Sequence, residues 1–197
     1  MKFNEVVFDV ETKKAFSDVG GRMNPERLGV SVVGAYFYKD DSFRSFIESE
    51  LKYFFEEIAS VERIIGFNIN NFDIPVLQPY SSFNLKSLPA LDLLEELSKV
   101  LGYRVSLDSL SQATLGAGKS GDGLNAIKLY RENRIDELKK YCLQDVKLTR
   151  DLYEFAQKEK KLYFLSPLGQ KKEVNFFVSE PIRKEISGAF NFQSALF

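Results

Sequence analysis

The stretch "VVFDVETKK", residues 6–14, decides how the rest of the chain is interpreted. Its first residues, Val6 to Phe8, are an apolar run that predicts a buried strand. Asp9 and Glu11 follow with one residue between them, so on a strand their side chains share a face, about 7 Å apart. Two neighbouring carboxylates raise each other's pKa, and a divalent cation neutralises both. The alternative is a strand that frays into solvent at residue 9, with both carboxylates exposed.

The counts of titratable residues restrict the chemistry of the chain. It has no histidine and one cysteine, Cys142. Catalysis by Ser-His-Asp or Cys-His groups is therefore excluded, as is any zinc site that uses histidine. A bound metal would take oxygen ligands, as Mg²⁺, Mn²⁺ and Ca²⁺ do. Because the formal net charge is only −1, contact with nucleic acid would need a local basic face or metal ions.

The length of 197 residues predicts one domain. We expect residues 1–161 to form its main body and residues 162–197 a C-terminal β-hairpin extension or interaction segment. A single cysteine permits no internal disulfide, which is typical of a reducing compartment. Glu5 and Asp9 interrupt the apolar run that a signal peptide would need, and no apolar stretch is long enough to span a membrane. These features predict a cytoplasmic protein with no membrane contact.

Hydrophobic periodicity predicts a mixture of strands and helices. Strands are expected at residues 3–10, 28–38, 40–46 and 62–68, at the start of 88–102, and twice within 162–178. Helices are expected at residues 47–60, 72–80, 106–116, 124–133 and 135–161, and in the remainder of 88–102. Strands come first and helices then alternate with short strands. This order predicts an α/β fold with a central mixed β-sheet flanked by helices.

The second acidic candidate is Asp73, in "GFNINNFDIPVL" (66–77). A short apolar strand and three asparagines precede it, and a predicted helix follows it. An aspartate directly before a helix is a common N-cap, which is the alternative interpretation. A capping carboxylate would still have one oxygen to offer a metal-bound water.

The third candidate is the pair Tyr141 and Asp145, in "YCLQDV" (141–146). The two residues are four apart on a predicted helix, so their side chains lie on one face. The alternative is an exposed aspartate beside a half-buried tyrosine on a surface helix.

Together, the three motifs resemble the DEDD superfamily of 3′–5′ exonucleases, in its tyrosine subclass. "FDVET" (8–12) matches the first motif of the family, "GFNINNFDIPVL" the second and "YCLQD" (141–145) the third. The resemblance covers roughly residues 3–155 and is closest to the exonuclease domain of family B DNA polymerases and its stand-alone relatives. Since the chain has no histidine, the subclass with histidine in the third motif is excluded.

The resemblance implies a ribonuclease H-like fold with two Mg²⁺ or Mn²⁺ ions in the active site. It implies that Asp9 bridges both metals and that Glu11 and Asp145 complete the site of the metal that activates water. Asp73 would hold the second metal through a water molecule. Tyr141 would orient the attacking water, because a tyrosine with a pKa of about 10 is not a base at neutral pH.

Residues in and beside the motifs are candidate substrate contacts. Aromatic side chains can stack on a base, and amide or ammonium groups can contact a terminal nucleotide or a phosphate. The alternatives are core packing for the phenylalanines, backbone hydrogen bonds for the asparagines and a solvated loop for the lysine. The candidates are Thr12, Phe16, Asn68, Asn71, Phe72 and Lys119.

The resemblance implies an enzyme that hydrolyses phosphodiester bonds at single-stranded 3′ ends of DNA or RNA and releases nucleoside monophosphates. One alternative is a non-catalytic nucleic-acid-binding or scaffold module that keeps the fold. Another is an unrelated α/β protein with a calcium-binding or exposed acidic surface. The apolar sequence "SGAFNFQSALF" (187–197) suggests that the C-terminal segment binds a protein partner or a second copy of the chain.

Overall fold

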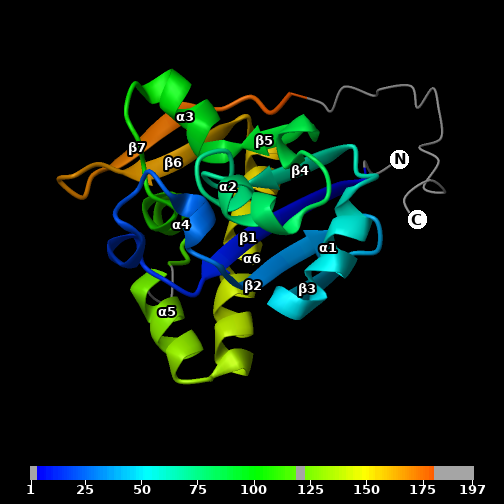
Figure 1. Ribbon diagram of the computed structural model, residues 1–197. Coiled ribbons are helices and arrows are strands. Elements are labelled where there is room, and N and C mark those ends of the chain that lie inside the picture. Colours follow the sequence, from blue (N-terminus) through cyan, green and yellow to red (C-terminus); the bar gives the residue numbers. More distant parts are fainter. Residues whose placement is uncertain (1–3, 119–122, 180–197) are drawn as a thin grey trace.

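A five-stranded sheet lies at the centre of the computed structural model, which describes residues 4–118 and 123–179 (Figure 1). The strand order is β3-β2-β1-β4-β5. Strand β1 pairs antiparallel with β2 and parallel with β4, so the predicted mixed sheet is confirmed. Strand β2 pairs antiparallel with β3, and β4 pairs parallel with β5. The strands are β1 (Glu5–Thr12), β2 (Val30–Phe37), β3 (Ser42–Ile47), β4 (Arg63–Gly66) and β5 (Ala90–Asp92).

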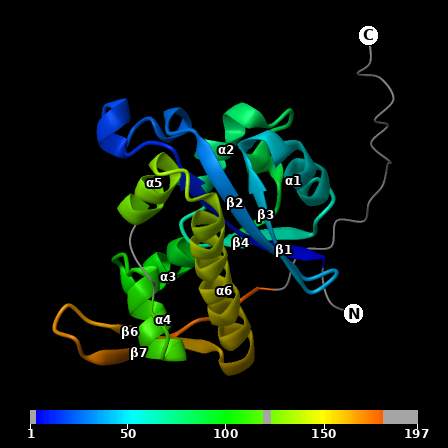
Figure 2. The same ribbon diagram turned by 90° about the horizontal axis from the view of Figure 1, so that it is seen from below.

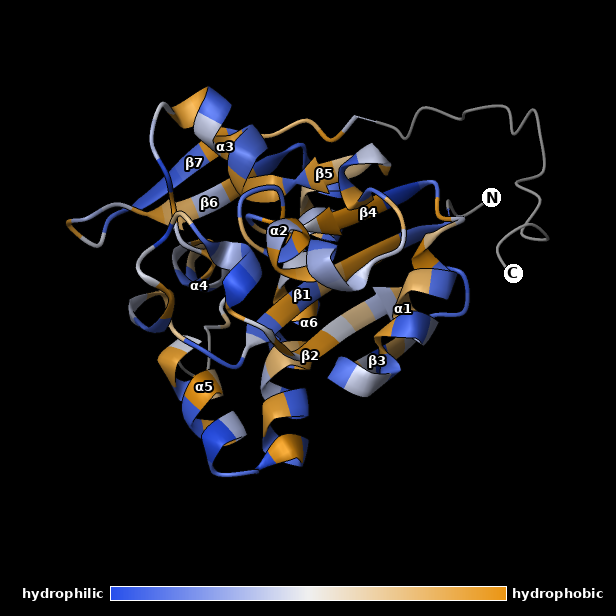
Figure 3. Ribbon diagram, in the orientation of Figure 1, coloured by the Kyte–Doolittle hydropathy of each residue, from blue (hydrophilic) through white to orange (hydrophobic). Residues whose placement is uncertain are grey.

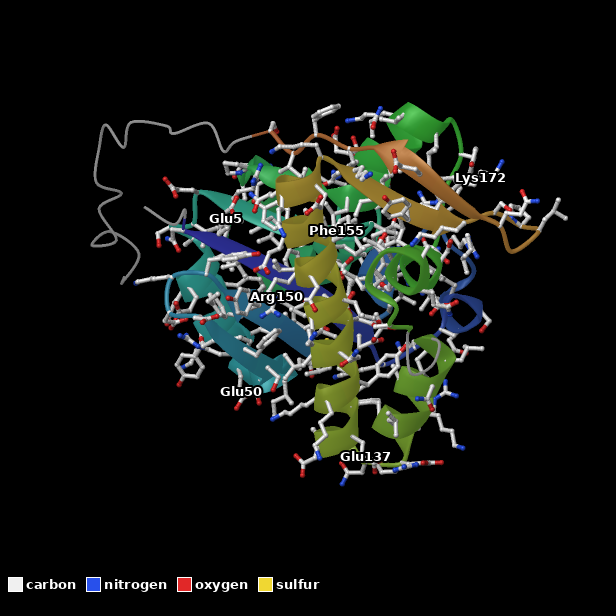
Figure 4. All side chains as sticks on the ribbon, turned by 180° about the vertical axis from the view of Figure 1, so that it is seen from behind. Glu5, Glu50, Glu137, Arg150, Phe155 and Lys172 are labelled. Atoms are coloured by element: carbon white, nitrogen blue, oxygen red, sulfur yellow. The ribbon has the colours of Figure 1, made fainter. Side chains whose placement is uncertain are left out.

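Helices cover both faces of this sheet. One face packs on α1 (Leu51–Ile58) and α2 (Asp73–Leu77). The other face is crossed by the long helix α6, which runs over the sheet in Figure 4 and from the centre downward in Figure 2. Within the described residues, no helix is both long and apolar enough to cross a membrane. The helices on the α6 side are α3 (Leu93–Leu101), α4 (Leu107–Leu115), α5 (Gly123–Arg131) and α6 (Ile135–Glu159).

The alternation of side chains along β1 places its acids toward α6. Val6, Phe8 and Val10 belong to the core on the α1 side of the sheet. Val7 belongs to the core on the α6 side. Since Asp9 and Glu11 alternate in step with Val7, they face α6 as well. Figure 3 shows these mostly hydrophobic central strands with mixed helices packed around them.

Capping residues mark the start and the end of α3. The Asp92 carboxylate accepts hydrogen bonds from the backbone N–H groups of Leu94 and Glu95 at the start of α3. Gly102 ends the same helix with a φ of 77°, a left-handed conformation that favours glycine. Short 3-10 helices lie in the connections, at η1 (Phe16–Val19), η2 (Pro25–Arg27), η3 (Glu48–Glu50), η4 (Gln78–Tyr80) and η5 (Leu85–Ser87).

A hairpin of β6 (Lys161–Leu165) and β7 (Lys171–Asn175) follows α6. Helix α4 binds one edge of it, because the Thr114 hydroxyl accepts from the backbone N–H of Tyr163 and donates to the carbonyl of the same residue. Ser109 makes the same two bonds to Leu165. The hairpin therefore packs on the core that α6 covers. A boundary at residue 161 stays a prediction, and residues 180–197 lie outside the described part of the chain.

Candidate metal centre

The carboxylates of β1 are held on a strand that stays paired with β2 as far as Thr12. Asp9 stands opposite Gly34 of β2, and Glu11 stands opposite Val32. Pairing continues to Thr12 through a β-bulge between Glu11 and Thr12. Glu11 is 8% exposed and Asp9 is half-buried. The interpretation of a strand that frays at residue 9 is therefore wrong, and the strand fixes both carboxylates toward α6.

Asp73 is tied to the same part of β1. It is the first residue of α2, and the N-cap position belongs to Phe72. One Asp73 carboxylate oxygen accepts a hydrogen bond of 2.8 Å from the backbone N–H of Val10, between the two acids of β1. The side chain is 2% exposed. The alternative of a helix cap is wrong, because the carboxylate bonds to the neighbouring strand.

Helix α6 supplies Tyr141 and Asp145 from its buried side. Tyr141 is 6% exposed and Asp145 is 2% exposed. Leu138 and Cys142 on the same helix pack with Val32 of β2, which seats this part of α6 on the sheet. The interpretation of an exposed aspartate beside a half-buried tyrosine is therefore wrong.

These elements bring three carboxylates together. Asp9, Glu11 and Asp145 each offer one oxygen atom, and the three atoms lie within 4.8 Å of one another. Oxygen ligands lie about 2.0–2.6 Å from Mg²⁺ or Ca²⁺, so one ion can contact oxygens at this separation. Asp73 lies outside this group of three and joins the site through its bond to Val10. Three carboxylate oxygens are a donor set that fits a hard divalent cation.

Negative charge dominates the surroundings of this site. Burial and the charge of Asp9 hold the pKa of the Asp73 carboxyl well above its usual range. Burial raises the pKa of the Cys142 thiol, and the charges of the carboxylates Asp9 and Glu11 add to this effect. A cation would lower these pKa values and stabilise the charged carboxylates. The field at this end of the sheet therefore favours a bound cation.

A hollow of about 240 Å³ is lined by residues that are next in sequence to two of the acids. Thr12, which follows Glu11, and Phe72, which precedes Asp73, both line it. Phe72 and Phe16 make an edge-to-face contact with ring centroids 5.8 Å apart and pack at the border of the core. Phe16 lines the hollow too, and the remaining lining residues are Lys14, Ala15, Leu28, Gly123 and Leu124.

The predicted asparagine contacts have protein partners of their own. The Asn68 side-chain oxygen accepts a hydrogen bond of 2.7 Å from Arg104, and the Asn68 backbone N–H donates to Asp92. Asn71 is exposed. Lys119 lies outside the described residues. Contact of these residues with a substrate stays a prediction.

Asp92 does more than the sequence indicated. Beyond capping α3, its carboxylate accepts hydrogen bonds from the backbone N–H groups of Asn68 and Asn70, at 2.8 and 3.1 Å. It thereby holds the loop that leads to Asp73. The available signal was an aspartate at the junction of a predicted strand and a predicted helix. It could be used only once the pairing of β4 with β5, in which Asp92 is the last residue, was known.

Comparison with known proteins places the fold. The family model described as the RNase_H superfamily matches residues 6–157. None of the curated proteins matches the chain. One similar solved structure is the family B DNA polymerase from the hyperthermophilic archaeon Pyrobaculum calidifontis, with a TM-score of 0.60 and 16% sequence identity. The match covers 79% of this chain but only 25% of the polymerase chain, and at this identity it shows the fold alone.

Proposed function

The chain belongs to the ribonuclease H superfamily, and on this basis we propose that it is a metal-dependent 3′–5′ exonuclease for single-stranded nucleic-acid ends. The observation that carries the proposal is the group of Asp9, Glu11 and Asp145, whose oxygens lie within 4.8 Å of one another. Like charges gathered in a partly buried site are costly unless a ligand offsets them.

The carboxylates would hold two Mg²⁺ or Mn²⁺ ions. Asp9, Glu11 and Asp145 are the first ligands of the site, and Asp73 supports it from α2 through its bond to Val10. Such ions stabilise charge on the scissile phosphate and provide a nucleophile at neutral pH. They also allow an anionic substrate to approach a cluster of acids.

The tyrosine of α6 has a positioning role in this proposal. Tyr141 precedes Asp145 by four residues, so both side chains project from one face of α6. The Tyr141 side chain is buried, which restricts its movement. We assign it the orientation of the attacking water, which requires a fixed geometry rather than a change of charge.

The hollow lined by Thr12, Phe16 and Phe72 would receive the terminal base. Phe16 and Phe72 offer aromatic surface there, and stacking contributes about 1–3 kcal/mol per base. Stacking does not depend on base identity, so we expect little sequence preference. A base can enter the hollow only when it has left a duplex, which favours a single-stranded end.

The test uses single-stranded DNA and RNA oligonucleotides labelled at the 5′ end, incubated with MgCl₂, MnCl₂ or EDTA. We expect stepwise shortening from the 3′ end, release of nucleoside monophosphates, and no reaction in EDTA. Asp9→Asn is expected to abolish shortening. Asp136→Asn, which removes an exposed acid from the first turn of α6, is the matched control and is expected to be active.

Absence of shortening in every metal would contradict the proposal, as would equal shortening by Asp9→Asn. Binding of the oligonucleotide without turnover would instead favour the non-catalytic module. The burial of Glu11, Asp73 and Asp145 already argues against an exposed acidic surface.

A further inference from the structure

The middle of β2 contains a glycine, Gly34, at a position where helix α6 packs tightly on the strand. A Cβ atom at Gly34 would lie 2.9 Å from the Cys142 Sγ atom and 3.1 Å from a methyl carbon of Val146. It would also lie 3.3 Å from the backbone carbonyl carbon of Cys142. Carbon atoms pack at about 3.5–4.0 Å, so a larger residue fits only if the Cys142 and Val146 side chains, or α6 itself, move. A glycine within a strand often marks such a close approach.

This contact lies directly under the carboxylates. Gly34 is the residue of β2 that pairs with Asp9. Across the contact, the Cys142 Sγ atom lies 3.4 Å from the Asp9 carbonyl oxygen and 3.8 Å from an Asp9 carboxylate oxygen. Asp145 follows Cys142 by three residues, which is less than one turn of the same helix. The separation of α6 from β2 therefore sets the distance from Asp145 to Asp9.

We propose that Gly34 is a positioning residue of the carboxylate site. By leaving out a side chain, it lets α6 bring Asp145 within reach of the ion that Asp9 and Glu11 bind. The inference rests on the proposed function for the identity of the ligand, but the spacing it describes is a property of the fold. Gly34 touches none of the reacting groups and acts through the position of α6.

The proposal predicts a selective effect on metals. Mg²⁺ requires near-ideal octahedral geometry at about 2.0–2.1 Å, whereas Ca²⁺ accepts flexible geometry at about 2.3–2.6 Å. A small outward movement of α6 should therefore weaken Mg²⁺ binding more than Ca²⁺ binding. We expect Gly34→Ala to lose about 10- to 100-fold in Mg²⁺ affinity, the range seen when groups that orient metal ligands are changed.

The experiment measures Mg²⁺, Mn²⁺ and Ca²⁺ affinities by calorimetry for the unmodified chain, Gly34→Ala, Cys142→Ala and the double variant. Gly34→Ala should lower the ratio of Mg²⁺ to Ca²⁺ affinity. The double variant should regain part of it, because the Sγ atom nearest to the new methyl group is gone. Gly102→Ala is the control: it strains a left-handed residue at the end of α3, so it should lower the melting temperature and leave the affinities unchanged.

Equal affinities in Gly34→Ala and the unmodified chain would overturn the inference, as would equal losses in Gly34→Ala and Gly102→Ala. If Gly34→Ala does not fold, Cys142→Met enlarges the helix side of the same contact and should give the same selective loss. If the unmodified chain binds no metal, the proposed function fails instead. The spacing is then tested by the crystal structure of Gly34→Ala: an outward shift of α6 supports the inference and an unmoved helix overturns it.

Discussion

Buried carboxylates lie at both ends of β1, and α6 contacts both ends. At one end the carboxylate is paired with a cation of the protein, and at the other end carboxylates lie beside one another. At the start of β1, Glu5 is paired with Arg63 of β4 at 2.6 Å, and both side chains are only 5% exposed. Tyr153 of α6 donates a hydrogen bond of 2.8 Å to the second Glu5 oxygen. Arg63 also donates to the Tyr153 hydroxyl and to the Ser179 carbonyl. The charge at this end is neutralised within the protein.

At the other end of β1, where the strand meets the middle of α6, like charges are brought together. Asp9 and Glu11 of β1 meet Asp145 of α6 within 4.8 Å, and Asp73 is buried beside them. The contacts at the first end connect β1, β4, α6 and the segment that follows β7, and they stabilise the fold. At the second end, repulsion between the carboxylates destabilises the metal-free fold, and a bound cation would stabilise the fold. The comparison predicts that changes at the two ends separate stability from activity.

The largest expected effect is on activity, at the acidic end. Asp145→Asn removes one carboxylate ligand and should reduce the nuclease rate about a thousandfold, which corresponds to about 4 kcal/mol of transition-state stabilisation. The metal-free variant should be as stable as the unmodified chain or more stable, because a repulsion is removed. The measurements are single-turnover kinetics and urea unfolding in EDTA. Strong destabilisation with retained activity would break the comparison.

The next effect is on stability, at the opposite end. Arg63→Met leaves the Glu5 carboxylate buried without its cation, which should reduce the free energy of unfolding by about 3–5 kcal/mol. The double variant Glu5→Gln/Arg63→Met should recover part of the loss. Mg²⁺ affinity at temperatures where the variant is folded should be unchanged. A parallel loss of metal affinity would show that the two ends are coupled.

A smaller effect is expected at the tyrosine of α6. Tyr141→Phe keeps the buried ring and removes the hydroxyl. If the hydroxyl positions the nucleophile as proposed, this positioning should be lost while the carboxylates stay. We expect a decrease in rate of about 100-fold, the size of effect that small errors in positioning produce. Metal affinity, measured by calorimetry, should not change. A rate equal to that of the unmodified enzyme would remove Tyr141 from the site.

The smallest effect is the pH dependence of metal-free stability. The pKa of Asp73 is raised in the folded chain, so its stabilising contribution is complete below its unfolded pKa and is lost as pH rises through its folded pKa. The melting temperature in EDTA should therefore fall over this window, and Asp73→Asn should flatten the fall. Mg²⁺ should reverse it, because the metal competes with the proton. A melting temperature that rises over the same window would contradict the raised pKa.

The elements of the fold could be predicted because their signals are local. Each signal depends on residues that are close in sequence. These signals are the alternation of side chains along β1, the N-caps Asp92 and Ser106, and the glycines that end α3 and α4. The motif acids could be listed from the sequence for the same reason.

Their arrangement could not be derived in this way. The distance from Asp9 to Asp145 depends on how closely α6 sits on Gly34, which is a contact between segments about a hundred residues apart in sequence. The Asp73 bond to Val10 and the Asp92 bonds to the asparagine loop also require the order of the strands to be known. Packing between segments distant in sequence determines the Asp9–Asp145 distance and both sets of hydrogen bonds.

Anomalous diffraction from crystals soaked in MnCl₂ tests whether the carboxylates at the acidic end of β1 and in the middle of α6 form a two-metal site. We predict two manganese peaks about 3.5–4 Å apart, the usual separation in two-metal sites. One ion should contact Asp9, Glu11 and Asp145, with no peak beside Glu5. Full-occupancy manganese elsewhere on the chain, with none at these carboxylates, would contradict the account.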